Sequence, residues 1–258
     1  MLKIKSKYLN KFIMIFLNIS LFLTSISCND YKKIVNKNII TNKIIRIQQA
    51  NNLANLIHAK HHHTFYCNCY YKNKIIDLNS CGYKIQKNKK RAERLEWEHI
   101  VPVSRLAKNL ACWNIAICCN QKICYKGRAC CKKIDPYFLK MATDLHNIVP
   151  EIGELNLIRS NYSFAELPHI KSDQFGSCNF KIDRKQRKVE ANQFVKGIIA
   201  RTYLYMHDCY NLNLSLEEKK LFNKWNYKYP PNSWEIDWNK KVYQIQHTDN
   251  QYISKYVK

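Results

Sequence analysis

Twelve cysteines restrict how this chain can fold more than any other feature, once the folding compartment is known. The N-terminus indicates that compartment, because four lysines precede an apolar run from Phe12 to Ile26 that closes on small residues. This layout predicts a secretory signal peptide over residues 1–27, and the run is short for a membrane-spanning helix. Cysteines in an oxidising compartment form disulfides, so we expect a disulfide-stabilised domain.

Cys28 directly follows the predicted signal peptide, and three alternatives remain for the N-terminus: lipidation of Cys28, ordinary cleavage nearby, or an uncleaved anchor. Bacterial lipidation uses a cysteine just after small residues, whereas ordinary cleavage nearby would leave no anchor. Ser25 is atypical for the first position of a lipidation motif. We expect an exported protein, periplasmic or secreted, with a lipid anchor through Cys28 as the alternative and no membrane span in the mature chain.

Zinc binding is the competing role for the cysteines. Three consecutive histidines, His61, His62 and His63, come shortly before Cys67 and Cys69. The cysteine spacings do not form the paired C-x-x-C knuckles of zinc sites, and a histidine run in a basic stretch is more often a solvated linker. Disulfides are therefore favoured, and the pairing of the cysteines stays open.

An excess of basic residues indicates that the binding partner is negatively charged. The chain has 43 Lys and Arg against 19 Asp and Glu, a formal net charge of +24. A surface this basic attracts polyanions such as nucleic acid, acidic lipid or acidic polysaccharide. The 46% hydrophobic and 12% aromatic content excludes a disordered tail, a collagenous repeat and a polytopic membrane protein.

The apolar pattern predicts one mixed α+β domain over residues 45–258, after a leader over residues 28–44, since no repeat or linker divides the chain. Ser215 and Glu218 form a capping box that opens a helix ahead of a Pro-Pro stop. The other segments with a clear periodicity are 43–58 (helix), 64–100 (strands), 135–147 (helix) and 187–208 (helix).

Two short segments carry residue types suited to metal-assisted attack on a phosphodiester. Glu98 and His99 end an apolar strand before Pro102, and they offer a hard oxygen ligand beside a base that works near neutral pH. Asp144 and Asn147 are three residues apart at a predicted helix end and so share a face. Spacing alone does not establish the chemistry.

Short motifs that contain these segments run in order through residues 45–253. They include TFYCNC (64–69), SCGY (80–83), RAER (91–94), WEHIVP (97–102), DLHN (144–147), GELN (153–156), FGSC (175–178), IARTYLYM (199–206) and LFNKWN (221–226). With them the chain resembles the bacterial endonuclease I family, periplasmic or secreted nucleases. The resemblance implies a ββα-metal (His-Me finger) nuclease core.

The resemblance also implies roles for individual residues. His99 becomes the general base that deprotonates the attacking water, and Glu98 and Asn147 become the protein ligands of a single Mg²⁺ ion. Arg128 becomes the contact to the scissile phosphate. Neighbours on a regular strand face opposite sides, so Glu98 and His99 act together only if the strand ends or bulges there.

The family implies an endonuclease with little sequence preference, DNA as main substrate, RNA as a second, and products with 5′-phosphates. We expect a monomer. Asp144 and His146 are expected to hold the helix end and the metal-bound water rather than to take part in the chemistry. Glu154, Asn156 and Arg159 are expected to line the site or the groove.

The chain departs from the family pattern around Arg128. Lys126 stands in place of the first glycine of the family's Gly-Gly-Arg, after an apparent insertion from Asn114 to Ile123. This insertion brings extra cysteines, which offer new bridges. Two alternatives remain: a catalytically weak nucleic-acid-binding protein of the same fold, and a cell-surface module that binds polyanions generally. The intact Glu98, His99 and Asn147 argue against the first.

Overall fold

The computed structural model describes residues 46–257, so the predicted signal peptide, Cys28 and most of the leader lie outside the described residues. The longer helices are α3 (Ile47–Ile57), α7 (Arg128–Ile134), α8 (Pro136–Ala142), α9 (Gly153–Arg159), α10 (Gln193–Tyr210), α11 (Leu216–Lys228) and α12 (Ser233–Gln246). The short ones are η1 (Asn79–Cys81), α4 (Lys89–Ala92), α5 (Val103–Leu106), α6 (Ala111–Asn114), η2 (Leu145–Asn147) and α13 (Gln251–Ser254).

The strands are short and belong to several small sheets. They are β1 (Tyr71–Lys72), β2 (Ile75–Ile76), β3 (Leu95–His99), β4 (Cys118–Cys119), β5 (Cys124–Tyr125), β6 (Ile148–Ile152), β7 (Ser163–Phe164), β8 (Lys181–Asp183) and β9 (Lys188–Glu190). None of the helices in the described part of the chain has the length and apolar character that crossing a bilayer requires.

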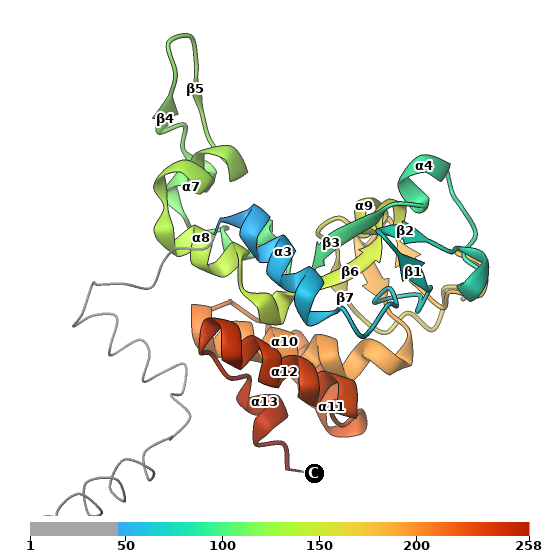
Figure 1. The fold of residues 1–258 in the computed structure, drawn as a ribbon. Helices are drawn as coiled ribbons and strands as arrows, with labels where there is room; N and C mark the ends of the chain where they lie inside the picture. Colours follow the sequence, from blue (N-terminus) through green and yellow to red (C-terminus); the bar gives the residue numbers. More distant parts are fainter. Residues whose placement is uncertain (1–45, 258) are drawn as a thin grey trace, which may run out of the picture.

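An antiparallel pair, β3 with β6, lies at the centre of the molecule (Figure 1). Its register runs from Leu95 opposite Ile152 to His99 opposite Ile148. Helix α9 begins directly after β6 and packs against both strands. The pair and the helix together form a strand–strand–helix unit that carries the candidate site.

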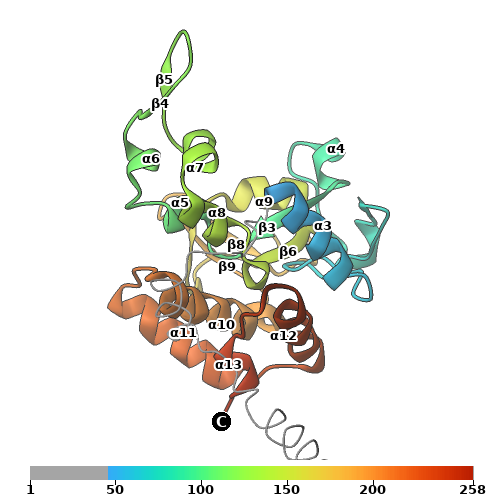
Figure 2. The same ribbon diagram turned by 60° about the vertical axis from the view of Figure 1, so that its left-hand side comes forward.

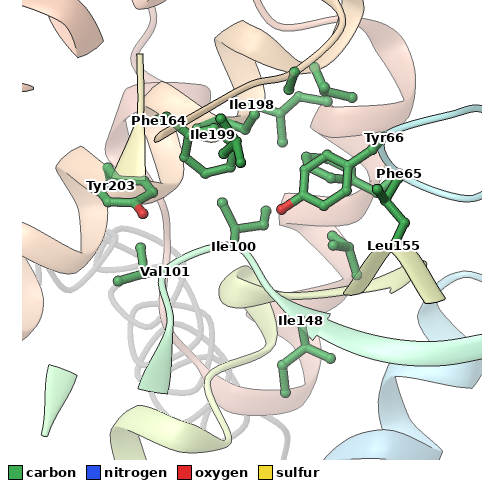
Figure 3. Packing of buried hydrophobic residues seen from close by; sticks show 14 of the residues in the cluster. Phe65, Tyr66, Ile100, Val101, Ile148, Leu155, Phe164, Ile198, Ile199 and Tyr203 are labelled. Carbon is green, nitrogen blue, oxygen red and sulfur yellow. The ribbon is translucent and has the colours of Figure 1, made fainter. Parts of the chain in front are cut away.

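The core joins this unit to the C-terminal helices. Strand β6 is buried at every position, and α10 is buried along most of its length. Figure 3 shows Ile100, just after β3, surrounded by Tyr66, Ile148, Ile199 and Tyr203. Helices α10 to α13 form one group on the opposite side of the molecule from α4 and α9 (Figures 1 and 2).

Five disulfides join described cysteines, and they confirm the predicted disulfide-stabilised α+β domain. The pairs are Cys67–Cys178, Cys69–Cys81, Cys112–Cys131, Cys118–Cys130 and Cys119–Cys124. Because Cys67 and Cys69 are both in disulfides, the zinc alternative loses the two thiolates it required.

The sequence prediction of local structure is accurate where the signal is local. The helix at 43–58 is confirmed as α3 over its described residues, and the Ser215 capping box opens α11 as predicted. The segment 64–100 contains the strands β1, β2 and β3, but η1 and α4 lie between them. The helix predicted at 187–208 is wrong at its start, because residues 188–190 form β9, which pairs with β7 and β8.

Candidate active site

A cavity of about 630 Å³ opens beside the end of β3. Its wall contains polar and charged side chains and two tryptophans, and these residues come from several separate segments of the chain. The residues that matter for chemistry are Trp97, Glu98, His99, Trp113, Arg128, Lys132, Asn156 and Arg159. The cavity thus joins β3, the start of α7 and one face of α9.

His99 is held with one ring nitrogen committed to the backbone. Its Nε2 lies 2.9 Å from the carbonyl oxygen of Ala142, the last residue of α8. A carbonyl only accepts hydrogen bonds, so Nε2 carries the hydrogen, and Nδ1 of the neutral ring keeps its lone pair. Burial lowers the pKa of His99 to about 4, while the Ala142 hydrogen bond acts to raise it and the Arg128 charge to lower it. The ring is therefore neutral at pH 7 and able to accept a proton.

Glu98 is a buried carboxylate with three donors around it. Arg159 Nη1 lies 2.9 Å from Oε1, the Tyr66 hydroxyl donates to the same oxygen at 3.1 Å, and the His99 N–H donates to Oε2 at 3.1 Å. Burial raises the pKa of Glu98, whereas the Arg159 charge and the Tyr66 hydroxyl act to lower it. The carboxylate is thus fixed in one orientation at the cavity wall.

Arg159 also fixes the end of β3. Its guanidinium donates to the carbonyl of His99 at 2.9 Å and to the carbonyl of Ile100. These contacts occupy backbone groups where β3 stops, and the strand ends at His99. From sequence, Glu98 and His99 could share a site only if the strand ended or bulged there. The strand does end at His99, and both residues line the same cavity.

Replacing Arg159 with methionine is expected to destabilise the protein by about 3–5 kcal/mol, because it leaves the buried Glu98 charge without its partner. Urea unfolding at pH 7 measures the change. Arg184→Met is the matched control, since it removes one positive charge from an exposed position, and it should stay within about 0.5 kcal/mol of wild type. Equal losses for the two variants would contradict the structural role of Arg159.

The structure does not bring Asn147 into the cavity. Its side chain is fully buried and bonds to the backbone of Val101, accepting from the N–H at 2.7 Å and donating to the carbonyl at 3.0 Å. Both functional atoms of the amide are therefore used. Asn147 holds the segment that follows His99 rather than facing the space beside Glu98.

Asn156, unlike Asn147, lines the cavity. It lies in α9, and its Nδ2 donates to Glu96 Oε2 at 3.2 Å. Arg91 in turn holds Glu96 with two bonds of 2.9 Å. This leaves Asn156 Oδ1 without a donor among residues 46–257, and Asn156 lines the cavity with Glu98. Sequence reasoning had placed Asn156 near the site or groove but without a role.

Arg128 lines the cavity as predicted, from the first position of α7. Lys132 lies one helical turn later on the same face and lines the cavity as well. His99 lines the same cavity, and the Arg128 charge acts to lower the pKa of His99. Arg128 and Lys132 therefore line the cavity together with His99.

Three other polar residues of the matched motifs stabilise the fold. Asp144 accepts from the hydroxyls of Tyr205 at 2.9 Å and Tyr210 at 2.6 Å. His146 Nε2 lies 3.1 Å from the Thr248 carbonyl. Glu154 accepts from the backbone N–H groups of residues 86–88 and does not line the cavity.

The donor set of the cavity suits a hard cation with few protein ligands. Within residues 46–257, no three side chains of His, Cys, Asp or Glu gather as a metal cluster. Among the described residues that line the cavity, Glu98 is the one carboxylate, and Asn156 adds an amide oxygen. Mg²⁺ commonly keeps several waters and takes one or two protein oxygens, so these residues fit it better than they fit zinc.

Comparison with known proteins agrees with this geometry. The family described as Endonuclease I matches residues 20–256. The chain is 38% identical over 239 residues to Endonuclease-1 of Buchnera aphidicola subsp. Acyrthosiphon pisum (strain APS), covering 91% of this chain and 88% of that protein.

Two further relatives come from Aeromonas hydrophila. An extracellular deoxyribonuclease is 39% identical over 209 residues, which cover 78% of this chain and 86% of that protein. A periplasmic deoxyribonuclease is 37% identical over 204 residues, which cover 77% of this chain and 81% of that protein. The chain is similar to these nucleases over most of its length, and its strand–strand–helix unit positions a histidine at a cavity. The protein therefore belongs to the endonuclease I family and is a nuclease.

Proposed function

We propose that this protein is an exported, Mg²⁺-dependent endonuclease that hydrolyses DNA with little sequence preference, with RNA as a second substrate and 5′-phosphates on the products. The observation that carries the proposal is the neutral His99 ring, whose Nδ1 is left to accept a proton in a cavity that also contains Arg128 and Glu98. The names of the extracellular and periplasmic relatives support both the export and the substrate.

In this proposal His99 is the general base. Its Nδ1 takes a proton from the water that attacks the phosphorus atom, and the Nε2–H bond to Ala142 keeps the ring oriented throughout. The carbonyl of Ala142 also stabilises the positive charge that the ring then gains. Arg128 and Lys132 bind the oxygens of the scissile phosphate. The forked guanidinium of Arg128 can donate two parallel hydrogen bonds to a phosphate.

Glu98 and Asn156 are the residues that would hold the divalent cation. When bound, Mg²⁺ supplies positive charge that stabilises the phosphate and the leaving 3′-oxygen. Glu96 accepts the hydrogen bond from Asn156 Nδ2 and leaves the amide oxygen available to a cation. Arg159 and Tyr66 orient the Glu98 carboxylate. The assignment of Asn147 from sequence is replaced here by Asn156, because the Asn147 amide is fully engaged with Val101.

Cleavage of a supercoiled plasmid by the purified, oxidised protein tests the function. The expected result is conversion to nicked, linear and then short products in Mg²⁺, and no conversion in EDTA. Plasmids of unrelated sequence should be cut at similar rates, since phosphate contacts position the duplex without reading bases. Retention of the plasmid in a gel without cleavage would instead identify a nucleic-acid-binding protein.

Two asparagine variants test the metal site against each other. Asn156→Ala is expected to raise the Mg²⁺ concentration that gives half-maximal cleavage by about tenfold or more. Asn147→Ala is expected to leave that concentration unchanged and to lower the free energy of unfolding by about 1–3 kcal/mol, because it leaves the buried Val101 groups unpaired. Mg²⁺ titrations of the cleavage rate, with urea unfolding of both variants, measure the two effects. The opposite pattern would restore Asn147 as the ligand.

A further inference from the structure

A hairpin next to the active site has features that catalysis does not explain. It comprises residues 115–126, with β4 and β5 as its two strands. In both views it extends away from the rest of the molecule (Figures 1 and 2). Its base is at the cavity, because Trp113 precedes it, Arg128 follows it, and both residues line the cavity.

The hairpin is braced to be rigid. A two-stranded hairpin of this size is marginally stable by itself. Cys119–Cys124 closes its tip, Cys118–Cys130 ties it to α7, and Cys112–Cys131 ties the preceding α6 to the same helix. At the turn, Asn120 accepts from the backbone N–H groups of Lys122 at 3.0 Å and Ile123 at 2.9 Å. The tip is thus held in one shape before any partner arrives.

This rigid element exposes isoleucines to solvent. Ile115 is 59% exposed, Ile117 is 48% exposed, and Ile123 at the tip is 65% exposed. Exposed apolar side chains on an element that projects from the molecule are available for contact with a partner. The hairpin contributes nothing to the main core, so these isoleucines are not explained by folding.

The charge of the surrounding chain identifies the partner. Residues 99–134 contain seven Lys and Arg and no Asp or Glu. Lys122 and Lys126 lie on the hairpin itself, Arg128 and Lys132 line the cavity beside it, and none of these four forms an ion pair within the described residues. Basic side chains on the hairpin and in the adjacent cavity are complementary to a polyphosphate backbone.

We propose that the hairpin enters the minor groove of duplex DNA and inserts Ile123 between base pairs as an apolar wedge. Lys122 and Lys126 then contact phosphates on either side. Proteins that insert apolar side chains into the minor groove unstack a base step, kink the duplex and widen their contact with it. The proposal rests on the proposed function, and it specifies double-stranded DNA as the substrate that this site holds best.

A wedge beside the cavity has a consequence for cleavage. The kink brings the phosphate backbone next to the bent step toward Arg128 and His99, which lie at the base of the hairpin. Single-stranded DNA has no base step of this kind to open. Ile123 therefore contributes to duplex binding and to duplex cleavage, and has no part in the chemistry or in the use of single strands.

Binding and bending of a duplex in EDTA, where no cleavage takes place, test the wedge. The probe is a short duplex with a fluorophore at each end, so that energy transfer reports the bend and anisotropy reports the dissociation constant. Ile123→Ser is expected to weaken binding by about tenfold and to abolish the bend. Its salt dependence should match wild type, because the lysine contacts remain.

Ile75→Ser is the matched control, since Ile75 is 66% exposed on β2, away from the hairpin. It should bind and bend the duplex as wild type does. Both variants should keep the wild-type melting temperature and the wild-type affinity for a single strand of the same length. The double variant Ile117→Ser, Ile123→Ser gives a second measurement and should weaken duplex binding further.

Three outcomes would overturn the wedge. The first is an Ile123→Ser protein that binds and bends the duplex like wild type, and the second is an equal loss for single and double strands. The third is binding to vesicles of anionic lipid that depends on Ile123 while duplex binding does not, which would make the hairpin a membrane contact. Wild-type protein that fails to cut plasmid in Mg²⁺ would contradict the proposed function itself, so the two failures are distinguishable.

Discussion

Replacing His99 with alanine is expected to lower the rate of DNA cleavage by about 10²–10⁴-fold, the usual contribution of a general base. The position of the ring explains the size of the loss. Its Nε2 is fixed to the Ala142 carbonyl, and its low pKa keeps Nδ1 unprotonated at neutral pH. No other histidine lines the cavity among the described residues, so no neighbour replaces it.

The same variant is expected to bind DNA almost as tightly as wild type. Binding comes from many phosphate contacts to lysines and arginines, whereas the base acts only in the chemical step. Single-turnover cleavage together with binding in EDTA separates the two effects. His169→Ala, at an exposed histidine paired with Asp183, is the control and should cut at the wild-type rate. A His99→Ala protein that still cuts near that rate would remove His99 from the mechanism.

Reduction of the disulfides is expected to abolish activity, although no cysteine lines the cavity within residues 46–257. Cys112–Cys131 and Cys118–Cys130 anchor α7, the helix that begins with Arg128. A disulfide typically contributes about 2–4 kcal/mol, and a domain's whole margin is about 5–15 kcal/mol. Loss of several bridges therefore removes more stabilising free energy than the domain's whole free energy of unfolding.

Cleavage after incubation with dithiothreitol, in excess Mg²⁺, measures this effect. Protein made in a reducing cytoplasm should be weak or inactive, and oxidative export should activate it. Paired serine variants divide the contributions: replacing Cys118 and Cys130 should lower activity more than replacing Cys119 and Cys124, which close only the hairpin tip. A zinc-selective chelator should have no effect. Full activity in protein whose thiols are mostly free would contradict the structural role of the bridges.

Much of the local structure and chemistry could be predicted from the sequence. The Ser215 capping box opens α11 because the groups that make it lie three residues apart. Glu98 and His99 were found because they are adjacent and end an apolar strand. The use of cysteines in disulfides was predicted from the N-terminal export pattern, and the five bridges among the described residues confirm it.

Relations between distant residues were decided only by the tertiary structure. Twelve cysteines allow many pairings, and spacing does not choose among them. In the fold, Cys112 and Cys130 pair with Cys131 and Cys118 rather than with each other. Residues 188–190 form a strand because β7 and β8 provide its hydrogen-bond partners, although their own sequence belongs to a helical pattern.

The proposed second ligand of the metal ion shows the same division. From sequence, Asn147 and Asn156 are both asparagines in matched motifs near the end of a predicted element. The register of β3 against β6 turns Asn147 toward Val101 and places α9, with Asn156 and Arg159, against the cavity. Adjacent residues determine caps, strand ends and the pairing of a base with a carboxylate. The packing of the whole chain decides which side chains share a cavity. Each such contact joins segments that are far apart in the sequence, and the local sequence does not determine how distant segments meet.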